Sequence, residues 1–334
     1  MKTFNKISAL KLLDKVVGIP LVFFLLLTRR NRSRSPHGIK DILLIRPGGI
    51  GDAVLLLPAL HSLKEQFPNA RIDVLCEKRN ADIFKLSSDI NTIYLYDRGL
   101  DLLKVLRKPY DVVIDTEQWH RLSAVVARLT GAPVRIGFDT NERRKLFTHC
   151  IPYGHDDYEV YSFFHLLAPL TGKINHFKID EPFIDISSDA CCSLPSETEI
   201  KDNLIALLPG ASVKAKKWGI EKFGEVARTF SSKGYRIVLL GSHADQRDAE
   251  EIEEYANCLN LTGKTSLRYA ATILRMSRLL ITADSGLMHL AYGVGTPTIS
   301  IFGCSVEKKW APPGRKHTVI NKRLSCSPCT KFGY

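Results

Sequence analysis

Runs of apolar residues alternate with amphipathic stretches along most of the chain. One apolar run covers residues 41–46, a glycine-rich turn follows at 47–52, and residues 53–66 show helical periodicity. A parallel strand that is covered on both faces is apolar throughout, whereas a helix packed on a sheet repeats its apolar positions about every 3.6 residues. The pattern therefore predicts a strand, a tight turn and a helix.

This unit repeats through both halves of the chain. In the first half, further strands are expected at 71–76, 92–96, 111–115 and 134–138, with helices near 81, near 102 and at 121–129. In the second half, strands are expected at 203–208, 235–241, 278–283 and 297–303, with helices at 221–231, 244–256, 266–276 and from 285. This alternation predicts an α/β fold with two doubly wound, Rossmann-like domains. The serine-rich stretch 185–202 separates them, so we expect domains at 38–184 and 185–334, the second sheet ending with strand 297–303.

Glycine turns follow four of the predicted strands, at residues 48–51, 210, 241 and 286. Two parallel sheets that face each other form a cleft at the carboxyl ends of their strands, where α/β proteins bind ligands. We therefore expect the functional site between the domains.

One of these turns has the features of a phosphate site. Asp284 and Ser285 precede a helix, whose free N–H groups and dipole favour an anion, although both residue types also serve as ordinary helix caps. His289 lies one helical turn after Ser285 and therefore on the same face. Sequence spacing leaves a ligand site and a capped helix with an unrelated histidine as equal alternatives.

Two further clusters lie at predicted strand ends. Gly48, Gly49 and Gly51 would let a ligand approach the backbone, and Asp52 stands at the helix start, either as a functional carboxylate or as a cap. Their spacing differs from the dinucleotide motif G-x-G-x-x-G, which argues against a nicotinamide cofactor. Lysines 214, 216 and 217 beside Trp218 could neutralise a diphosphate or form a solvated surface, and we favour the diphosphate.

The charge distribution bears on possible partners. The 334-residue chain has a net charge of +12, and residues 1–40 carry nine Lys/Arg and one acid, a net +8. The small remaining excess of positive charge is spread over the rest of the chain, and this distribution argues against a nucleic-acid-binding groove.

The N-terminal segment, residues 1–37, combines this charge with an uncharged apolar run at 16–27. The run is too short for a membrane span, and arginines follow where a signal peptide would be cleaved. We expect the segment to associate with an anionic membrane surface; a helix packed on the body of the protein is the alternative.

The eight cysteines are scattered through the chain, which favours reduced thiols in the cytoplasm. Cys326 and Cys329 have the spacing of half a zinc site, but no second pair follows, so we expect no metal site.

Three blocks of residues resemble a known family. The blocks at 45–52, 209–218 and 284–289 resemble, in order and spacing, glycosyltransferase family nine, the bacterial heptosyltransferases of lipopolysaccharide core assembly. The resemblance covers about residues 40–330, and the block 284–289 is its most specific part. It implies a GT-B fold, with two Rossmann-like domains facing a central cleft, and inverting sugar transfer without metal or cofactor.

The resemblance also implies roles for individual residues. Asp52, in an acceptor-side first domain, is expected to deprotonate the acceptor hydroxyl as general base. In a nucleotide-sugar-binding second domain, Lys216 is expected to hold the donor diphosphate, Ser212 to lie near the phosphates and Asp245 to hold the ribose. A second part of the diphosphate cradle is expected from Asp284, Ser285, Gly286 and His289.

The expected function is transfer of a sugar, with ADP-heptose as the favoured donor, to a lipopolysaccharide core or other glycolipid on the inner face of the cytoplasmic membrane. A sugar-nucleotide epimerase of the same fold and a non-catalytic sugar-nucleotide-binding protein are the alternatives. The epimerase would have no use for a membrane anchor. In the binding protein, Asp52 would be only a helix cap.

Overall fold

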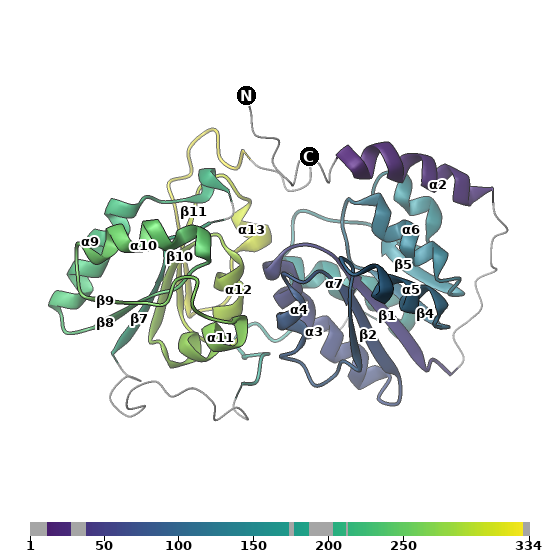
Figure 1. Cartoon of the computed structure of the whole chain (residues 1–334), viewed down its shortest axis with the longest axis horizontal. Coiled ribbons are helices and arrows are strands. Elements are labelled where there is room, and N and C mark those ends of the chain that lie inside the picture. Colours follow the sequence, from purple (N-terminus) through teal and green to yellow (C-terminus); the bar gives the residue numbers. More distant parts are fainter. Residues whose placement is uncertain (1–11, 28–37, 174–176, 187–202, 212, 330–334) are drawn as a thin grey trace.

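The computed structural model describes residues 12–27, 38–173, 177–186, 203–211 and 213–329. These residues form two α/β domains that lie side by side, with the first domain in blue and teal and the second in green and yellow in Figure 1. Each domain contains a six-stranded parallel sheet with helices against it. The structure confirms the predicted α/β fold of two Rossmann-like units.

The first sheet has the strand order β3-β2-β1-β4-β5-β6. Its strands are β1 (Asp41–Arg46), β2 (Arg71–Cys76), β3 (Thr92–Leu95), β4 (Val112–Asp115), β5 (Val134–Phe138) and β6 (His149–Ile151). The chain reverses its direction across the sheet between β1 and β4, whose carboxyl ends therefore flank the usual ligand crevice. Arg46 ends β1 and Asp115 ends β4.

The second sheet has the strand order β12-β11-β10-β7-β8-β9, which repeats the pattern of the first. Its strands are β7 (Leu204–Leu208), β8 (Arg236–Leu239), β9 (Cys258–Asn260), β10 (Leu279–Ala283), β11 (Thr298–Phe302) and β12 (His317–Asn321). The crevice here lies between β7 and β10, and Asp284 directly follows β10. The expectation that strand 297–303 closes this sheet is wrong, because β12 pairs with β11 beyond it.

Helices of the first domain connect and cover its strands. They are α3 (Ile50–Gln66), α4 (Ala81–Phe84), α5 (Gly99–Arg107), α6 (Arg121–Leu129), the 3-10 helix η2 (Glu142–Leu146) and α7 (Glu159–Thr171). Residues 53–60 of α3 are buried on every side, because this helix packs against α7 and also against the second domain. Its lack of a polar face follows from that central position.

The second domain has a similar set of helices. They are η3 (Lys214–Lys216), α9 (Ile220–Ser232), η4 (His243–Asp245), α10 (Gln246–Glu253), α11 (Leu267–Met276), α12 (Gly286–Gly293) and α13 (Glu307–Trp310). Helix α12 faces α3 across the junction of the domains (Figure 1).

The chain passes between the domains along α12. The backbone N–H groups of Phe183 and Ile184 both donate to the carbonyl of Gly293, each at 2.9 Å, and the Tyr292 hydroxyl donates to the carbonyl of Ile179 at 2.8 Å. The segment just before the predicted linker therefore already contacts the second domain. Most of the predicted linker, residues 187–202, lies outside the described residues.

The described part of the N-terminal segment packs on the first domain. A short π-helix, η1 (Asp14–Gly18), continues into α2 (Ile19–Leu26), which lies beside α6 (Figure 1). The Asp14 carboxylate accepts hydrogen bonds from the N–H groups of Arg121 and Leu122, at 2.7 and 3.0 Å, so it caps the start of α6. Val22 and Leu25 are buried in the same interface.

The outer face of this segment is apolar. Its exposed large side chains are Leu12, Leu13, Val16, Val17, Phe23, Phe24, Leu26 and Leu27. Among the described residues, no helix is both long and apolar enough to cross a bilayer. The segment thus packs on the protein with one face and presents the other to its surroundings.

Candidate active site

Two helix N-termini, one from each domain, meet at the junction. A methyl group placed on Gly51 of α3 would lie 2.7 Å from His289 Cδ2 and 3.6 Å from Gly286 Cα of α12. A methyl group on Gly286 would in turn lie 3.1 Å from Ile50 Cβ. Glycine at both positions therefore allows a backbone approach that any larger residue would obstruct. The positive ends of two helix dipoles converge here, as an anion site requires.

Each glycine of the first turn is needed for a different physical reason. Gly48 has φ +107°, a backbone conformation that residues with a side chain rarely adopt. A Cβ on Gly49 would lie 2.6 Å from Asp52 Oδ2. Gly51 touches the second domain, as described above. The sequence predicted that all three make room for a ligand, but two of them make room for protein side chains.

Asp52 lies in the first turn of α3 and is not its N-cap. The helix begins at Ile50 with Gly49 as N-cap, three residues earlier than predicted, so the expected capping position of Asp52 is wrong. The Asp52 side chain is 20% exposed. Gln118 Nε2 donates to Asp52 Oδ1 at 3.4 Å, and Arg46 Nη2 lies 3.8 Å from the same oxygen. Asp52 is therefore a partly exposed carboxylate whose orientation is fixed by the buried side chains of Gln118 and Arg46.

A buried cluster of charges supports this carboxylate. Arg46 donates to the Thr116 carbonyl at 2.6 Å and lies 3.6 Å from Glu117 Oε2, while Arg143 pairs with Asp115 at 2.5 Å. Burial alone would raise the pKa of Glu117, but Arg46 and neighbouring cations outweigh it and lower the pKa. Burial raises the pKa of Asp115 despite Arg143. Glu117 therefore supplies a fixed negative charge that keeps Arg46 in place.

The sequence patterns did not predict that Arg46, Glu117 or Gln118 belongs to the site. Arg46 ends β1, and the other two follow the end of β4, so all three lie at the point where the strand order reverses. Their position at strand ends was a usable signal, because ligands bind at such points. Their pairing with one another was not visible, because it joins residues about 70 positions apart.

On the opposite side, Lys216 and Asp284 form a close ion pair. Lys216 Nζ lies 2.6 Å from Asp284 Oδ2, and both side chains are buried. Lys217, in contrast, pairs with Asp248 of α10 at 2.5 Å. Of the two neighbouring lysines, Lys216 is the one turned toward the helix N-terminus of α12. Predicted members of the donor cradle thus lie together, although Lys216 contacts Asp284 itself.

His289 and Ser285 complete this side of the site. Burial lowers the pKa of His289 to about 4, although Asp284 and Asp52 oppose the shift, so the imidazole is neutral at pH 7. Its Nδ1 is buried and has no hydrogen-bond partner among the described residues. Ser285 is the N-cap of α12, but its hydroxyl contacts Thr282 Oγ1 at 3.2 Å and does not cap the helix. The Cδ2–Nε2 edge of the imidazole is the edge nearest Gly51, at the junction of the two domains.

Asp245 has a structural role that the sequence did not predict. Its Oδ2 accepts hydrogen bonds from the N–H and the hydroxyl of Ser242, at 2.9 and 2.7 Å, which forms a capping box at η4. A Cβ on Gly210 would lie 2.3 Å from its carboxyl carbon, so Asp245 also packs on the turn after β7. Ser212, the other residue expected near the donor, lies outside the described residues.

Aromatic side chains of the first domain lie close to the buried carboxylates of this cluster, since the Trp119 backbone N–H donates to Glu117 and the Tyr153 hydroxyl donates to Glu159. Trp119, directly after Gln118, stacks on His155 with ring centroids 6.2 Å apart, and Tyr153 meets both rings edge-on. Trp119 and Tyr153 are half-buried. Flat aromatic faces beside a carboxylate are suited to holding a sugar ring.

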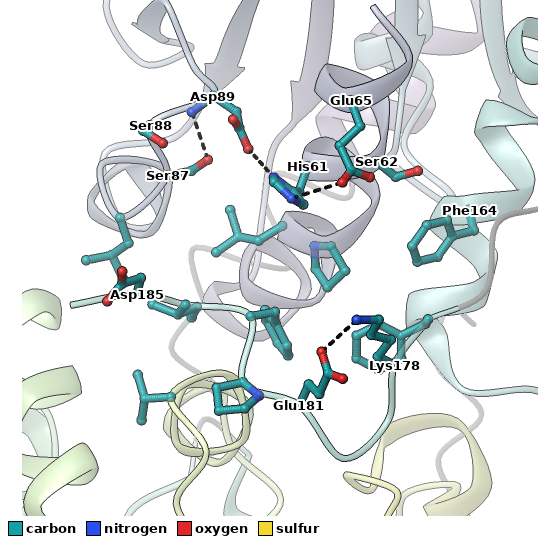
Figure 2. Close-up of a pocket in the computed structure, with 18 of the residues that line it drawn as sticks. His61, Ser62, Glu65, Ser87, Ser88, Asp89, Phe164, Lys178, Glu181 and Asp185 are labelled. Carbon is teal, nitrogen blue, oxygen red and sulfur yellow. Dashed lines mark hydrogen bonds and ion pairs between the residues drawn. The ribbon is translucent and has the colours of Figure 1, made fainter. Parts of the chain in front are cut away.

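A large cavity lies elsewhere. It has a volume of about 1190 Å³ and lies between the second half of α3 and residues 177–185, at the amino ends of the strands. Figure 2 shows His61 there between Asp89 and Glu65, with the ion pair of Lys178 and Glu181 across the space. None of the predicted site residues that the structure describes lines this cavity. We place the active site at the strand carboxyl ends, where the charged groups converge.

Comparison with known proteins gives consistent matches. Residues 100–333 match the family model described as glycosyltransferase family 9 (heptosyltransferase). Lipopolysaccharide heptosyltransferase 3 of Escherichia coli K12 is 30% identical over 78% of this chain and 82% of its own length. Lipooligosaccharide heptosyltransferase 2 of Haemophilus influenzae is 25% identical over 84% of this chain and 88% of its own.

Solved structures agree on the fold. The E. coli ADP-heptose lipopolysaccharide heptosyltransferase II superposes with a TM-score of 0.73 and 24% identity, over 86% of this chain and 92% of that one. The two parallel six-stranded sheets of this chain are thus arranged as in the GT-B fold.

Proposed function

Because the chain belongs to glycosyltransferase family 9, we propose that it is an inverting heptosyltransferase that moves heptose from ADP-heptose to a lipopolysaccharide-core acceptor. The similar proteins named heptosyltransferases support the sugar, and the relative named for ADP-heptose supports the nucleotide. The observation that carries the proposal is the meeting of the α3 and α12 N-termini, with Asp52 on one side and Lys216, Asp284 and His289 on the other.

In the proposed reaction, Asp52 accepts the proton of the acceptor hydroxyl. The hydroxyl oxygen then forms a bond to the anomeric carbon of heptose while the bond to the diphosphate breaks, and ADP leaves. Attack from the face opposite the diphosphate inverts the anomeric centre. The partial exposure of Asp52 supports this role, because the carboxylate can meet a substrate while Gln118 and Arg46 fix its orientation.

The leaving diphosphate needs positive charge as the bond breaks. Lys216 and the N-terminus of α12 supply it, and the His289 imidazole can donate a hydrogen bond to a phosphate oxygen. We propose that these groups replace a divalent cation. Transfer should then continue in excess EDTA; a loss of activity that returns with added metal would refute metal independence.

The acceptor lies on the first domain in this proposal. The Trp119 and His155 rings would hold a sugar of the acceptor. The apolar outer face of η1 and α2 would rest on the inner leaflet of the cytoplasmic membrane, where a glycolipid acceptor is embedded. This gives the protein a cytoplasmic, peripheral location.

The decisive experiment measures heptose transfer to isolated bacterial membranes and, in parallel, epimerisation of free ADP-heptose. Transfer supports the proposal, epimerisation favours the epimerase, and donor binding with neither reaction favours a binding protein.

Lys216→Ala tests the site itself. It should weaken binding of ADP about tenfold or more while affinity for adenosine stays unchanged, because a charged hydrogen bond to phosphate is lost.

Lys217→Ala is the matched control, since Lys217 pairs with Asp248 away from the site. Its ADP affinity should equal that of the wild-type protein. An equal loss of ADP and adenosine binding in Lys216→Ala would indicate a collapsed loop and contradict the assigned role.

A further inference from the structure

A lysine of the second domain is buried inside the first. Lys309, on α13, has a side chain that is only 2% exposed. Its ammonium donates to the Gly154 carbonyl at 2.8 Å and to Ser162 Oγ at 2.7 Å, and it pairs with Glu159 Oε2 at 2.9 Å and Asp157 Oδ1 at 3.2 Å. All four partners belong to the first domain. The position of this charge therefore depends on how the two domains sit against each other.

Glu159, at the start of α7, is fully buried and receives hydrogen bonds on both oxygens. Tyr153 OH donates to Oε2 at 2.9 Å, and Gln118 Nε2 donates to Oε1 at 2.7 Å. Burial raises the pKa of Glu159, and Lys309 opposes this shift. A buried carboxylate is costly unless a cation compensates it, so Lys309 is the group that keeps Glu159 charged in this pocket.

Gln118 connects this ion pair to Asp52. Its Oε1 faces Arg46, with Nη1 at 3.4 Å and Nη2 at 3.3 Å, so its Nε2 must face the two carboxylates. Nε2 lies 2.7 Å from Glu159 and 3.4 Å from Asp52. A charged Glu159 therefore fixes the amide in the orientation that donates to Asp52.

We propose that Lys309 is a positioning residue for the catalytic base, acting through Glu159 and Gln118, so that Asp52 is correctly held only when the second domain is seated on the first. The inference rests on the proposed function in taking Asp52 as the base. Loss of the Lys309 charge leaves Glu159 as an unpaired buried carboxylate, which takes up a proton or draws water into the pocket. Either change loosens the Gln118 amide and with it the hydrogen bond to Asp52.

The test compares Lys309→Met with Lys308→Met, a change of the exposed neighbouring lysine on the same helix. Lys309→Met should lower kcat about 10- to 100-fold, the range expected when a reacting group is slightly misplaced. The KM for donor and the affinity for ADP should stay unchanged, because Lys309 contacts none of the donor-side residues. Lys308→Met should retain the wild-type kcat. Equal kcat values for the two variants, or a loss confined to KM, would overturn the proposal.

A second variant separates positioning from general destabilisation. Glu159→Gln combined with Lys309→Met removes both charges but keeps an amide oxygen that can accept from Gln118, so it should recover most of the kcat lost in the single variant. This double variant also keeps the test decisive if Lys309→Met fails to fold. A lack of recovery in a double variant with wild-type melting temperature would refute the route through Glu159.

A crystal structure of the Lys309→Met variant gives a readout that does not depend on activity. Gln118 Nε2 should be displaced from Asp52, whereas an unchanged amide would overturn the inference. If the wild-type protein transfers no heptose, the proposed function fails, and this structure still decides whether Lys309 positions Gln118.

Discussion

At the scale of single residues, Asp52 is the position where a structural and a chemical role can be separated. Because Gly49 is the N-cap of α3, replacing Asp52 with Asn removes a modest dipole interaction and the 3.8 Å ion pair with Arg46. Asn keeps an oxygen that can accept from Gln118, and Glu117 still compensates the charge of Arg46. A general base contributes about 10²–10⁴ in rate. Asp52→Asn should therefore keep its melting temperature and ADP affinity while its transfer rate falls by about that factor.

Glu221→Gln is the control for this variant, because Glu221 also stands in the first turn of a helix, α9, but lies on the surface. Its transfer rate should match the wild type. An Asp52→Asn variant that keeps more than about a tenth of the wild-type rate would assign the proton transfer to another group.

His289 links the site to the pH dependence of stability. Burial lowers its pKa to about 4 from 6.5, so between these values the unfolded chain binds a proton that the folded protein does not. The contribution of His289 to the free energy of unfolding is therefore fully present above pH 6.5. About 3 kcal/mol of it is lost as the pH falls from 6.5 to 4. His289→Gln should therefore show a shallower decline in the free energy of unfolding over this range, measured by urea denaturation.

The informative quantity is the change in the free energy of unfolding with pH, and not its absolute value, because the other buried groups contribute equally to this change in both proteins. His61→Gln is the control, since His61 is exposed. Identical slopes for His289→Gln and the wild type would mean that the histidine is protonated, or accessible to water, in the folded state.

At the scale of elements, the central strands and the edge strand β3 were predictable from the sequence, whereas the other three edge strands were not. The predicted positions of β1, β2, β5 and α6 agree with the structure to the residue. Burial on both faces makes these strands largely apolar, and α6 repeats its buried positions with helical periodicity. The strands β6, β9 and β12 were missed, since each is short and only partly buried, so its sequence carries no continuous apolar run. Helix α7 was missed as well, although it provides Glu159.

The candidate site shows the same division. Residues in turns after strands, such as Asp52, Lys216 and Asp284, were identified from local sequence. Lys309 could not be identified from the sequence, because its role depends on partners about 150 positions away in the other domain. Local patterns therefore indicate the groups that we propose to face a ligand, and only the packed structure reveals the groups that hold them in place.

The segment of η1 and α2 yields a prediction at this scale. Asp14 caps α6, so deleting the segment would disturb the first domain and would not test membrane binding alone. Substitution of the outer face avoids this problem: Phe24 and Leu27 are 62% and 86% exposed. Phe24→Asp with Leu27→Asp should keep the wild-type stability but abolish co-sedimentation with phosphatidylglycerol vesicles, because charge cannot enter the acyl region.

Leu100→Asp with Leu103→Asp, on the exposed face of α5, is the matched control and should sediment with vesicles as the wild type does. Equal binding by the Phe24/Leu27 variant would show that the outer face of α2 does not contact the membrane.

At the scale of the whole molecule, two sheets of the same strand order place their reversal points opposite each other. The ends of β1 and β4 carry Arg46 and Gln118, and the end of β10 carries Asp284. Neither domain alone contains both the proposed general base and the proposed phosphate cradle. Catalysis in this arrangement requires close contact between α3 and α12, and the glycines at that contact determine how close it is.

Gly51→Ala tests this requirement. The added methyl group would lie 2.7 Å from His289 Cδ2, a distance that forces either the imidazole or the whole α12 N-terminus to move. Overpacking of this kind costs about 1–3 kcal/mol. The variant should have a lower melting temperature and weaker ADP binding, since the cradle opens, even though Gly51 itself offers ADP no side chain. The combination of Gly51→Ala with His289→Ala provides the space that the methyl group needs, so it should be more stable than Gly51→Ala alone. A double variant that is destabilised by the sum of the single effects would show that the two residues do not meet in solution, and that the domains sit further apart than the contact of α3 with α12 requires.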